Sequence, residues 1–412
     1  MKGFFKLISS SEFTGLFEQF LPIATEKVTL ADGHQRVLGT DILAGDNLPP
    51  FSRSTMDGYA VRAKDTFGCS ESEPALLNVI GEIAMGSSGR QYTLRPGQAL
   101  RIWTGGELPQ KGDGVVMVEY THQLDEQTVE IFRPVAPGQN TIRAGEDYQE
   151  GAAVLQQGRK LRPADLGVLA GLGITSIPVY RQPRVAIIST GDELVQPNRQ
   201  PGPGQIRDIN STTLAALVTE AGGIPLPLGI IGDDLNTMKE ACIKALEEAD
   251  VLLLSGGSSV GRRDFTLQVL EQIPQTRVLA HGVSIRPGKP TILASLGNQA
   301  LFGLPGHVAS AMVVFYLFVR PLLHKLQGRP CTMGLQAIRA ITGQQIPSTI
   351  GREEYVRVQL TPQPEDAPPL ATPIYGKSGL LKPLVQADGL LTIGRDVEGL
   401  DKGVEATILL FP

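Results

Sequence analysis

Cysteine is scarce in this sequence of 412 residues. The three cysteines, Cys69, Cys242 and Cys331, stand far apart and form neither a CxxC pair nor a disulfide framework. The histidines form no HExxH or other ligand pair, so we expect no zinc site. Few, scattered cysteines are typical of a reducing compartment, and we expect a cytoplasmic protein.

Long apolar runs are also missing. The longest, Val308 to Val319, spans about a dozen residues, whereas a membrane-spanning helix needs about twenty. We therefore predict a buried helix there and no membrane partner. The N-terminal stretch MKGFFKLISSSEF is interrupted by Lys6 and is followed by no small-residue cleavage site, so we predict no signal peptide.

An excess of positive charge is absent as well. The chain has 37 Lys and Arg against 42 Asp and Glu, and the two signs are mixed along its length. A protein whose main partner is nucleic acid needs a basic surface to neutralise phosphates, so we expect no such partner. P-loop, GxSxG and strand-linked GxGxxG motifs are missing too.

What the sequence does contain is 47 glycines and 30 prolines, which divide a multidomain α/β plus β chain into many short elements. Residues 1–49 and 141–180 have helical patterns and are expected to form one discontinuous domain. Residues 50–140 consist of short strands, which predict an inserted β domain. Residues 181–328 alternate strands with helices, as in a doubly wound parallel sheet, and residues 329–412 return to short strands, as in a small β barrel or sandwich.

The α/β segment carries two polar loops. Ligands of an open α/β sheet bind beyond the carboxyl ends of its strands, where residues 189–193 (STGDE) and 255–259 (SGGSS) stand. The second loop leads to Asp264, and its N–H groups and hydroxyls could wrap a phosphate. A glycine-rich turn without a ligand is an equally good interpretation at this point.

A basic turn follows at residues 285–290, IRPGKP. Arg286 and Lys289 flank a rigid Pro-Gly turn, an arrangement that suits a small oxyanion. The alternative is a solvated basic hairpin, because Pro-Gly commonly marks plain turns.

Several carboxylates stand beside glycine or turn residues: Asp57, Asp147, Glu193, Asp233 and Asp264. Short carboxylates on loops near a phosphate site are how proteins usually hold Mg²⁺. The alternative is that each one stabilises its own turn. For Asp57 both interpretations have direct support, because the Asp-Gly pair in STMDGYA is also a hairpin-turn signal.

An ordered series of motifs resembles one known family, the molybdopterin molybdenumtransferases, which includes the C-terminal enzymatic domain of gephyrin. The motifs cover essentially the whole chain and are PPFSRSTMDGYAV, RIWTGGELP, GVVMVEY, RAGEDYQEG, ADLGVLAGLGI, ISTGDEL, GQIRDINS, SGGSSVGRRDFT, IRPGKPT and GLPGHVASA. The resemblance implies a discontinuous elongated domain, an inserted β domain, a molybdopterin-binding α/β domain and a C-terminal β domain, assembled as a homodimer. It also implies Mg²⁺-dependent insertion of molybdate into adenylated molybdopterin, with release of AMP and the molybdenum cofactor.

The resemblance further implies roles for individual residues. The implied catalytic residues are Asp57, Asp147, Glu193, Asp233, Asp264 and Thr104. Those implied to contact the adenylate and pterin phosphates are Asn210, Ser211, Gly256, Gly257 and Ser259, and those implied to bind molybdate are Arg286, Lys289, Arg357 and Ser378. Asp57 and Asp264 are the implied Mg²⁺ ligands, with Asp57 of one subunit facing the α/β domain of the other. The adenylyltransferase and the apo-enzymes that accept the cofactor are implied as further partners.

The sequence departs from the family pattern at a few positions. Arg286 stands where a lysine is usual, and His307 and Val308 replace an Asn-Pro pair. Ser258 and Arg262 are further departures, which we expect on the pterin-phosphate side of the cleft together with His307. Molybdate and tungstate both remain candidates for the oxyanion, because the two are tetrahedral dianions of nearly equal size.

Two other functions compete with this enzyme. One is a scaffold role, which predicts decay of the charged site positions, yet all of them are present. The other is an adenylyltransferase or nucleotide amidase built on the α/β module alone. The MDGYA element and the two β domains count against it, since those enzymes do not need them.

Overall fold

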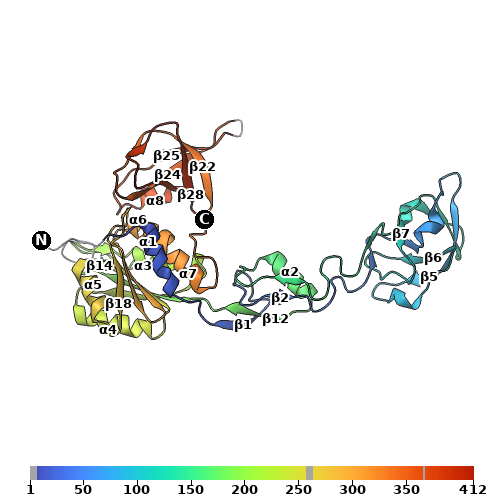
Figure 1. The fold of residues 1–412 in the computed structure, drawn as a ribbon, viewed down its shortest axis with the longest axis horizontal. Helices are drawn as coiled ribbons and strands as arrows, with labels where there is room; N and C mark the ends of the chain where they lie inside the picture. Colours follow the sequence, from blue (N-terminus) through green and yellow to red (C-terminus); the bar gives the residue numbers. More distant parts are fainter. Residues whose placement is uncertain (1–6, 257–262, 365–366) are drawn as a thin grey trace. The chain divides into compact units, whose positions relative to one another are not determined.

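The computed structural model describes residues 7–256, 263–364 and 367–412 (Figure 1). The chain divides into two compact units. The first unit comprises Met1–Glu26, Gln35–Gly39 and Val179–Pro412, and the second unit comprises Lys27–His34 and Thr40–Pro178. The finer predicted boundaries, at residues 50, 141 and 329, stay predictions.

The first unit is built on an open, mostly parallel sheet. In spatial order its strands are β16 (Ile224–Ile231), β13 (Arg184–Thr190), β17 (Val251–Gly256), β21 (Gln299–Leu304), β20 (Ile292–Leu296) and β18 (Arg277–His281). The strands from β16 to β21 are parallel, and β20 and β18 extend the sheet antiparallel. Along β13, Val185 and Ile187 belong to one buried cluster, and Ala186 and Ile188 to another. Both faces are therefore buried, as the doubly wound prediction requires.

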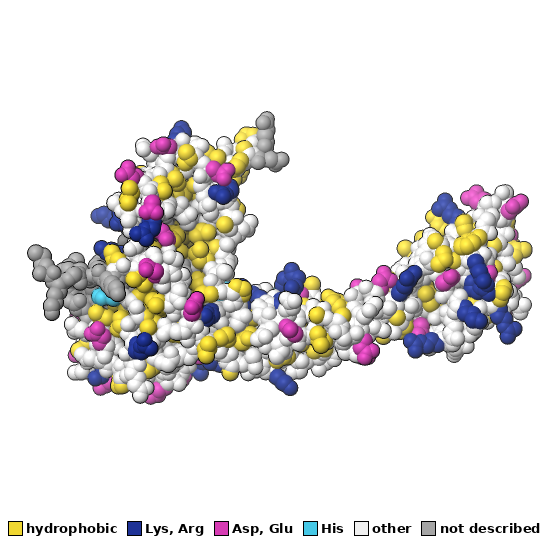
Figure 2. Space-filling view, in the orientation of Figure 1, with side chains coloured by type: hydrophobic (Ala, Val, Ile, Leu, Met, Phe, Trp, Pro, Cys, Tyr) yellow, Lys and Arg dark blue, Asp and Glu magenta, His cyan; other side chains and the backbone are white. Residues whose placement is uncertain are grey.

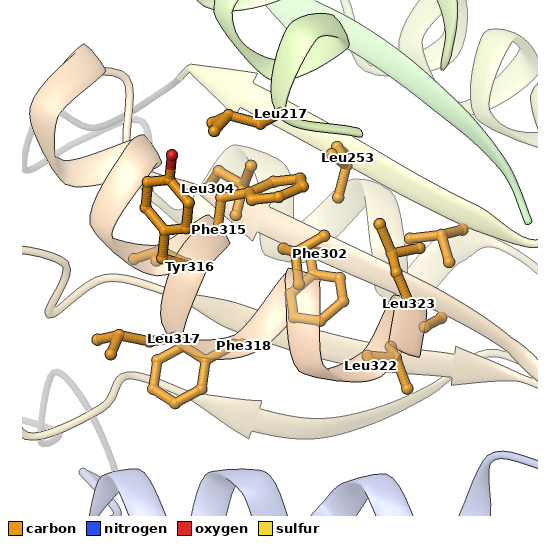
Figure 3. Packing of buried hydrophobic residues seen from close by; sticks show 14 of the residues in the cluster. Leu217, Leu253, Phe302, Leu304, Phe315, Tyr316, Leu317, Phe318, Leu322 and Leu323 are labelled. Atoms are coloured by element: carbon orange, nitrogen blue, oxygen red, sulfur yellow. The ribbon is translucent and has the colours of Figure 1, made fainter. Parts of the chain in front are cut away.

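Helices cover each face of this sheet. On one face, α4 (Leu235–Leu246) and α5 (Arg263–Gln272) bury apolar side chains against the strands. On the other face lie α1 (Ser10–Gly15), α3 (Asn210–Glu220) and a long helix composed of α6 (Val308–Val314), η5 (Phe315–Val319) and α7 (Arg320–Leu326). Figure 3 shows this second cluster, in which Phe315 and Phe318 of the long helix pack with Phe302 of β21.

The long helix is the predicted buried helix. Among the described residues it alone has the length and hydropathy of a membrane span, but 89% of its apolar segment is buried inside the fold, as in a core helix. The helix continues past the apolar run to Leu326. Pro321 does not end the helix, because it lies in the first turn of α7, after the π-helical turn η5, where proline is tolerated. Arg320 is accommodated by an ion pair of 2.7 Å with Glu220 of α3.

The first helical segment lies in the core of the first unit. Phe13, Phe17 and Phe20 are fully buried in the cluster on the α3 face of the sheet, and the ring centroids of Phe13 and Phe318 are 4.4 Å apart. This placement departs from the predicted grouping of residues 1–49 with 141–180. The physical reason is burial: three aromatic rings on one short segment need a large apolar surface, which the sheet and the long helix supply.

The C-terminal strands close into a barrel. Its strands are β24 (Glu353–Thr361), β25 (Leu370–Pro373), β22 (Ala337–Thr342), β28 (Glu405–Leu410) and β26 (Gly389–Ile393). Closure comes from β24, which pairs with β25 on one side and with β26 on the other. The short strand β19 (Ile285–Arg286) leaves the α/β part and pairs with the start of β24. This pairing joins the basic turn at 285–290 to the barrel.

The second unit contains the inserted β sheet. In spatial order its strands are β7 (Gly114–Met117), β4 (Gly58–Val61), β6 (Gln98–Ile102), β5 (Ala75–Ile83), β9 (Thr128–Ile131) and β8 (Thr121–Gln123). The same unit holds α2 (Pro163–Gly171) and the strand pairs β2 (Ile42–Leu43) with β11 (Ala153–Leu155), and β3 (Arg53–Ser54) with β10 (Thr141–Ile142). The division between the two units falls within β1 (Thr25–Thr29) and β12 (Ser176–Tyr180). On the face shown in Figure 2, Lys and Arg side chains lie among Asp and Glu side chains in both units.

The Asp57-Gly58 pair is not a two-residue hairpin turn. Gly58 is the first residue of β4, which pairs with β7, and a Cβ atom on Gly58 would lie 1.9 Å from the carbonyl oxygen of Val116. Glycine is therefore required by the close approach of two strands. Asp57 immediately precedes β4, and its side chain is exposed.

We expect Gly58→Ala to lower the free energy of unfolding of the second unit by about 2 kcal/mol, because the added methyl group has to displace the backbone of β7. Trp103, the single tryptophan, lies in this unit, so its fluorescence in urea reports on the transition. Gly167→Ala in α2 is the matched control: its Cβ meets nothing within 4 Å, and alanine should raise stability by about 0.5–1 kcal/mol. Equal unfolding midpoints for the two variants would contradict the steric argument.

Candidate functional site

Two adjoining cavities of the first unit contain six of the nine predicted first-unit site residues whose side chains the structure describes. The first cavity, about 290 Å³, opens at the carboxyl ends of β13 and β17. Its lining includes Thr190, Glu193, Asn210, Ser255, Gly256 and His307. The position agrees with the rule that open α/β sheets bind ligands at this edge.

Gly256 allows the first cavity to form. Its φ is +139°, and a Cβ there would lie 2.2 Å from the carbonyl oxygen of Thr190 and 2.3 Å from its hydroxyl oxygen. Only glycine permits this contact between β13 and β17. The Thr190 hydroxyl is buried and has no hydrogen-bond partner among the described residues, so it is a donor available to a ligand. Thr190, the last residue of β13, belongs to the polar stretch 189–193 that the sequence placed at this edge, although it was not among the predicted site residues.

Asn210 and Ser211 begin helix α3 and have different surroundings. The Asn210 amide donates to the Ser255 hydroxyl oxygen (2.7 Å) and to the Gly306 carbonyl (2.8 Å), which joins α3, β17 and the loop before α6 at the first cavity. The Ser211 hydroxyl lies 2.9 Å from that of Ser189 and is not part of the cavity lining. Asn210 therefore shapes the cavity, whereas the observed contact of Ser211 is internal.

Two predicted carboxylates, Glu193 and Asp233, also differ in their position relative to the first cavity. Glu193 lines the first cavity. Asp233 is not part of that lining, and its backbone amide donates to the Asp192 carboxylate (3.1 Å). The next residue, Asp234, caps α4 by accepting from the Thr237 amide (2.8 Å), and hydrogen bonds from Thr237 hold the pKa of its carboxyl below the usual value.

Part of the predicted phosphate loop lies outside the described residues, namely Gly257, Ser258, Ser259 and Arg262. Asp264 is the second residue of α5, and only its backbone is described. Among the described residues, no group of three His, Cys, Asp or Glu side chains is placed to hold a metal ion.

The second cavity, about 460 Å³, lies between the basic turn and the barrel. Arg286, Arg357 and Ser378 line it, as do Tyr355 and Glu354, which sequence reasoning missed. Three of the four residues implied for molybdate are thus brought together from β19, β24 and the loop after β25. Lys289 is not part of this lining.

The arginines of the second cavity differ in their partners. The Nη2 atom of Arg357 donates to the Gly376 carbonyl (2.8 Å), whereas its Nη1 atom is buried without a hydrogen-bond partner among the described residues. Burial lowers the pKa of this guanidinium, but arginine remains protonated at neutral pH. Arg286 is half exposed and forms an ion pair of 3.1 Å with Glu354. A buried, charged N–H group that lacks an acceptor is a strong site for an anion.

The two cavities meet at one side-chain contact. His307, which lines the first cavity, has its Nδ1 atom 2.8 Å from the hydroxyl oxygen of Ser378, which lines the second. The backbone carbonyl of Ser378 also accepts from the Ala309 amide (3.1 Å) at the start of α6. His307, expected on the phosphate side, therefore also contacts the lining of the second cavity.

Asp57 and Thr104 form a pair in the second unit. The Oδ1 atom of Asp57 accepts from the Thr104 amide (2.8 Å) and from the Thr104 hydroxyl (2.7 Å). These two bonds, with a smaller contribution from Arg101, hold the pKa of the Asp57 carboxyl below its usual value. The carboxylate is thus ionised, exposed and oriented, and no contact of its Oδ2 atom with a described residue is observed. Asp147 is exposed in the same unit, where its amide donates to the Leu48 carbonyl (3.0 Å).

Comparison with known proteins identifies the family. Three domain families match along the chain: the MoeA N-terminal region (domain I and II) at residues 8–173, a probable molybdopterin binding domain at 186–325, and the MoeA C-terminal region (domain IV) at 339–411. The molybdopterin molybdenumtransferase of Bacillus subtilis is 35% identical over 392 residues, which are 94% of this chain and 90% of the relative. The chain belongs to the molybdopterin molybdenumtransferase family.

Other relatives agree. The molybdopterin molybdenumtransferase of Haemophilus influenzae is 36% identical over 336 residues, 82% of this chain and 81% of its own. The crystal structure of the molybdopterin biosynthesis MoeA protein from Pyrococcus horikoshii OT3 superposes with a TM-score of 0.84 at 34% identity and covers 98% of this chain and 100% of that one. The predicted family, multidomain fold and transferase class are confirmed, and the family acts in molybdenum cofactor biosynthesis.

Proposed function

We propose that the protein inserts molybdate into adenylated molybdopterin in a Mg²⁺-dependent reaction and releases AMP and molybdenum cofactor. The names of the relatives support molybdopterin as the substrate and molybdenum as the metal that is transferred. The observation that carries the oxyanion site is the Nη1 atom of Arg357, which is buried without a partner among the described residues, in a cavity that adjoins the carboxyl edge of the α/β sheet. The net acidic chain needs such a local positive site to hold a dianion.

The first cavity suits the phosphate part of the substrate. Thr190 offers a hydroxyl that has no partner among the described residues, and Gly256 lets β17 approach Thr190 closely at the cavity. Asn210 acts indirectly, because its amide holds the Ser255 hydroxyl and the Gly306 carbonyl in place. The dithiolene of the bound substrate would then face the second cavity, where Arg357, Arg286 and Ser378 would hold the oxyanion.

The carboxylates fit Mg²⁺ in the way that proteins usually bind it, with one or two side chains and substrate phosphate oxygens. Asp57 suits this role because Thr104 fixes one carboxylate oxygen and no described residue is seen to bind the other. Asp57 and Asp264 would hold the ion, which would screen the phosphoanhydride charge. Asp147, Glu193 and Asp233 are proposed to complete the acidic surroundings.

We further propose a homodimer in which Asp57 of each subunit serves the cavities of the other. The three cysteines are free, which supports a reducing, cytoplasmic location. Partners in the same process would be the adenylyltransferase that supplies the substrate and the apo-enzymes that accept the cofactor.

Purified protein with adenylated molybdopterin, molybdate and Mg²⁺ is expected to release AMP and to yield cofactor that activates an apo-molybdoenzyme. AMP is quantified by chromatography against reactions without protein and without Mg²⁺. AMP release at the level of the no-protein control would refute the proposed reaction. A parallel reaction with tungstate separates the two dianions, because the preferred one gives the higher turnover at equal concentration.

A further inference from the structure

The contact between His307 and Ser378 is the one described side-chain bond that joins the linings of the two cavities. Its 2.8 Å length is that of a good hydrogen bond. The serine side of this contact is held in place by the Ala309 amide, which donates to the Ser378 carbonyl (3.1 Å). The ring also borders the first cavity, together with Glu193, Arg207 and Asp208.

The direction of this bond decides what the second cavity presents to an anion. A serine hydroxyl has one proton. If Ser378 donates that proton to the imidazole, only oxygen lone pairs face the cavity, and they repel a dianion. If the imidazole Nδ1–H donates to Ser378, the hydroxyl proton remains available for the anion. The Nη1 atom of Arg357, which has no partner in the part of the chain that the structure describes, favours an anion in this cavity, so the second arrangement is the consistent one.

We propose that His307 is a positioning residue that donates its Nδ1 proton to Ser378 and thereby directs the Ser378 hydroxyl proton toward the oxyanion. This inference rests on the proposed oxyanion site. The asparagine that the family resemblance implies at this position also carries an N–H donor on a short side chain. The role requires a donor at position 307, and the charge of the ring is not needed for it.

The test is equilibrium dialysis of the full-length protein against sodium molybdate, with molybdenum quantified by mass spectrometry. We expect His307→Ala to raise the dissociation constant about tenfold, the scale of one neutral hydrogen bond, and His307→Asn to restore most of the affinity. Ser378→Ala should weaken binding by a similar factor, and adding His307→Ala to it should have no further effect. Equal affinity of the alanine and asparagine variants, or fully additive effects, would overturn the proposal.

A spectroscopic measurement reports on the proton itself. In protein labelled with ¹⁵N-histidine and saturated with molybdate, the signal absent from His307→Asn belongs to residue 307, and its Nδ1 should be protonated. The tautomer with a bare Nδ1 would overturn the inference.

The variant Arg357→Gln distinguishes failure of the proposed His307 role from failure of the proposed oxyanion site. If Arg357→Gln loses molybdate binding while His307→Ala binds normally, the role of His307 is refuted and the oxyanion site stands. Failure of the wild-type protein to bind molybdate would sink the oxyanion site and this inference together.

Discussion

Arg357→Gln is expected to weaken molybdate binding by at least about tenfold and to lower AMP release in proportion at subsaturating molybdate. A hydrogen bond to a charged group contributes about 1.5–3 kcal/mol, and the Nη1 atom of Arg357 has no described partner other than the proposed anion. Equilibrium dialysis and initial rates measure the two effects. Arg357→Lys should recover only part of the affinity, because a lysine cannot reproduce the fork that holds Gly376 and the anion together.

The stability of this variant distinguishes a binding role from a structural one. A buried guanidinium nitrogen without an acceptor is unfavourable for the empty protein, so Arg357→Gln should leave the free energy of unfolding unchanged or raise it. Arg339→Gln is the matched control in the same barrel, since Arg339 forms an exposed pair with Glu405 (3.4 Å) and does not line the cavity. Unchanged molybdate affinity in Arg357→Gln would refute the oxyanion site.

Local patterns predicted the α/β part of the fold well. Strand β13 is a continuous apolar run, and a sheet covered on both faces requires such a run. The destination of the first helix could not be predicted, because the spacing of Phe13, Phe17 and Phe20 specifies an apolar face but not the surface that covers it. The closure of the barrel depends on β24 pairing with two strands distant in sequence, which is likewise not a local property.

The candidate site shows the same limit. Motifs found Arg286, Arg357 and Ser378, but their convergence in one cavity depends on the pairing of β19 with β24. Lys289 looked equivalent to Arg286 in the sequence and is not part of that lining. The contact of His307 with Ser378 joins residues 71 positions apart, and no periodic pattern reports such a pair.

Asp57→Asn is expected to lower AMP release by at least about a hundredfold while the fold is retained, because the variant removes a carboxylate that would hold Mg²⁺ beside the reacting anhydride. Asparagine keeps the Oδ1 atom that accepts both hydrogen bonds from Thr104, so only the charge and the second oxygen change. Asp125→Asn is the matched control in the same unit, since Asp125 is also exposed and accepts a backbone amide bond, from Gln127 (2.7 Å). Near-normal turnover of Asp57→Asn would refute its role.

Pairing this variant with Arg357→Gln tests whether each site is built from two subunits. If Asp57 of one subunit serves the cavities of the other, a heterodimer with one variant per chain has one site that lacks both residues and one intact site. At subsaturating molybdate, heterodimers purified through two different tags should then recover about half of the wild-type turnover per dimer. Homodimers of Arg357→Gln should keep about a tenth of the wild-type turnover or less, and those of Asp57→Asn about a hundredth or less. If instead each chain builds its own site, both sites of the heterodimer are damaged and no activity returns. Failure of the two tags to purify together would refute the dimer itself. The cross-subunit arrangement therefore stands only if one intact site forms from two chains that are each impaired alone.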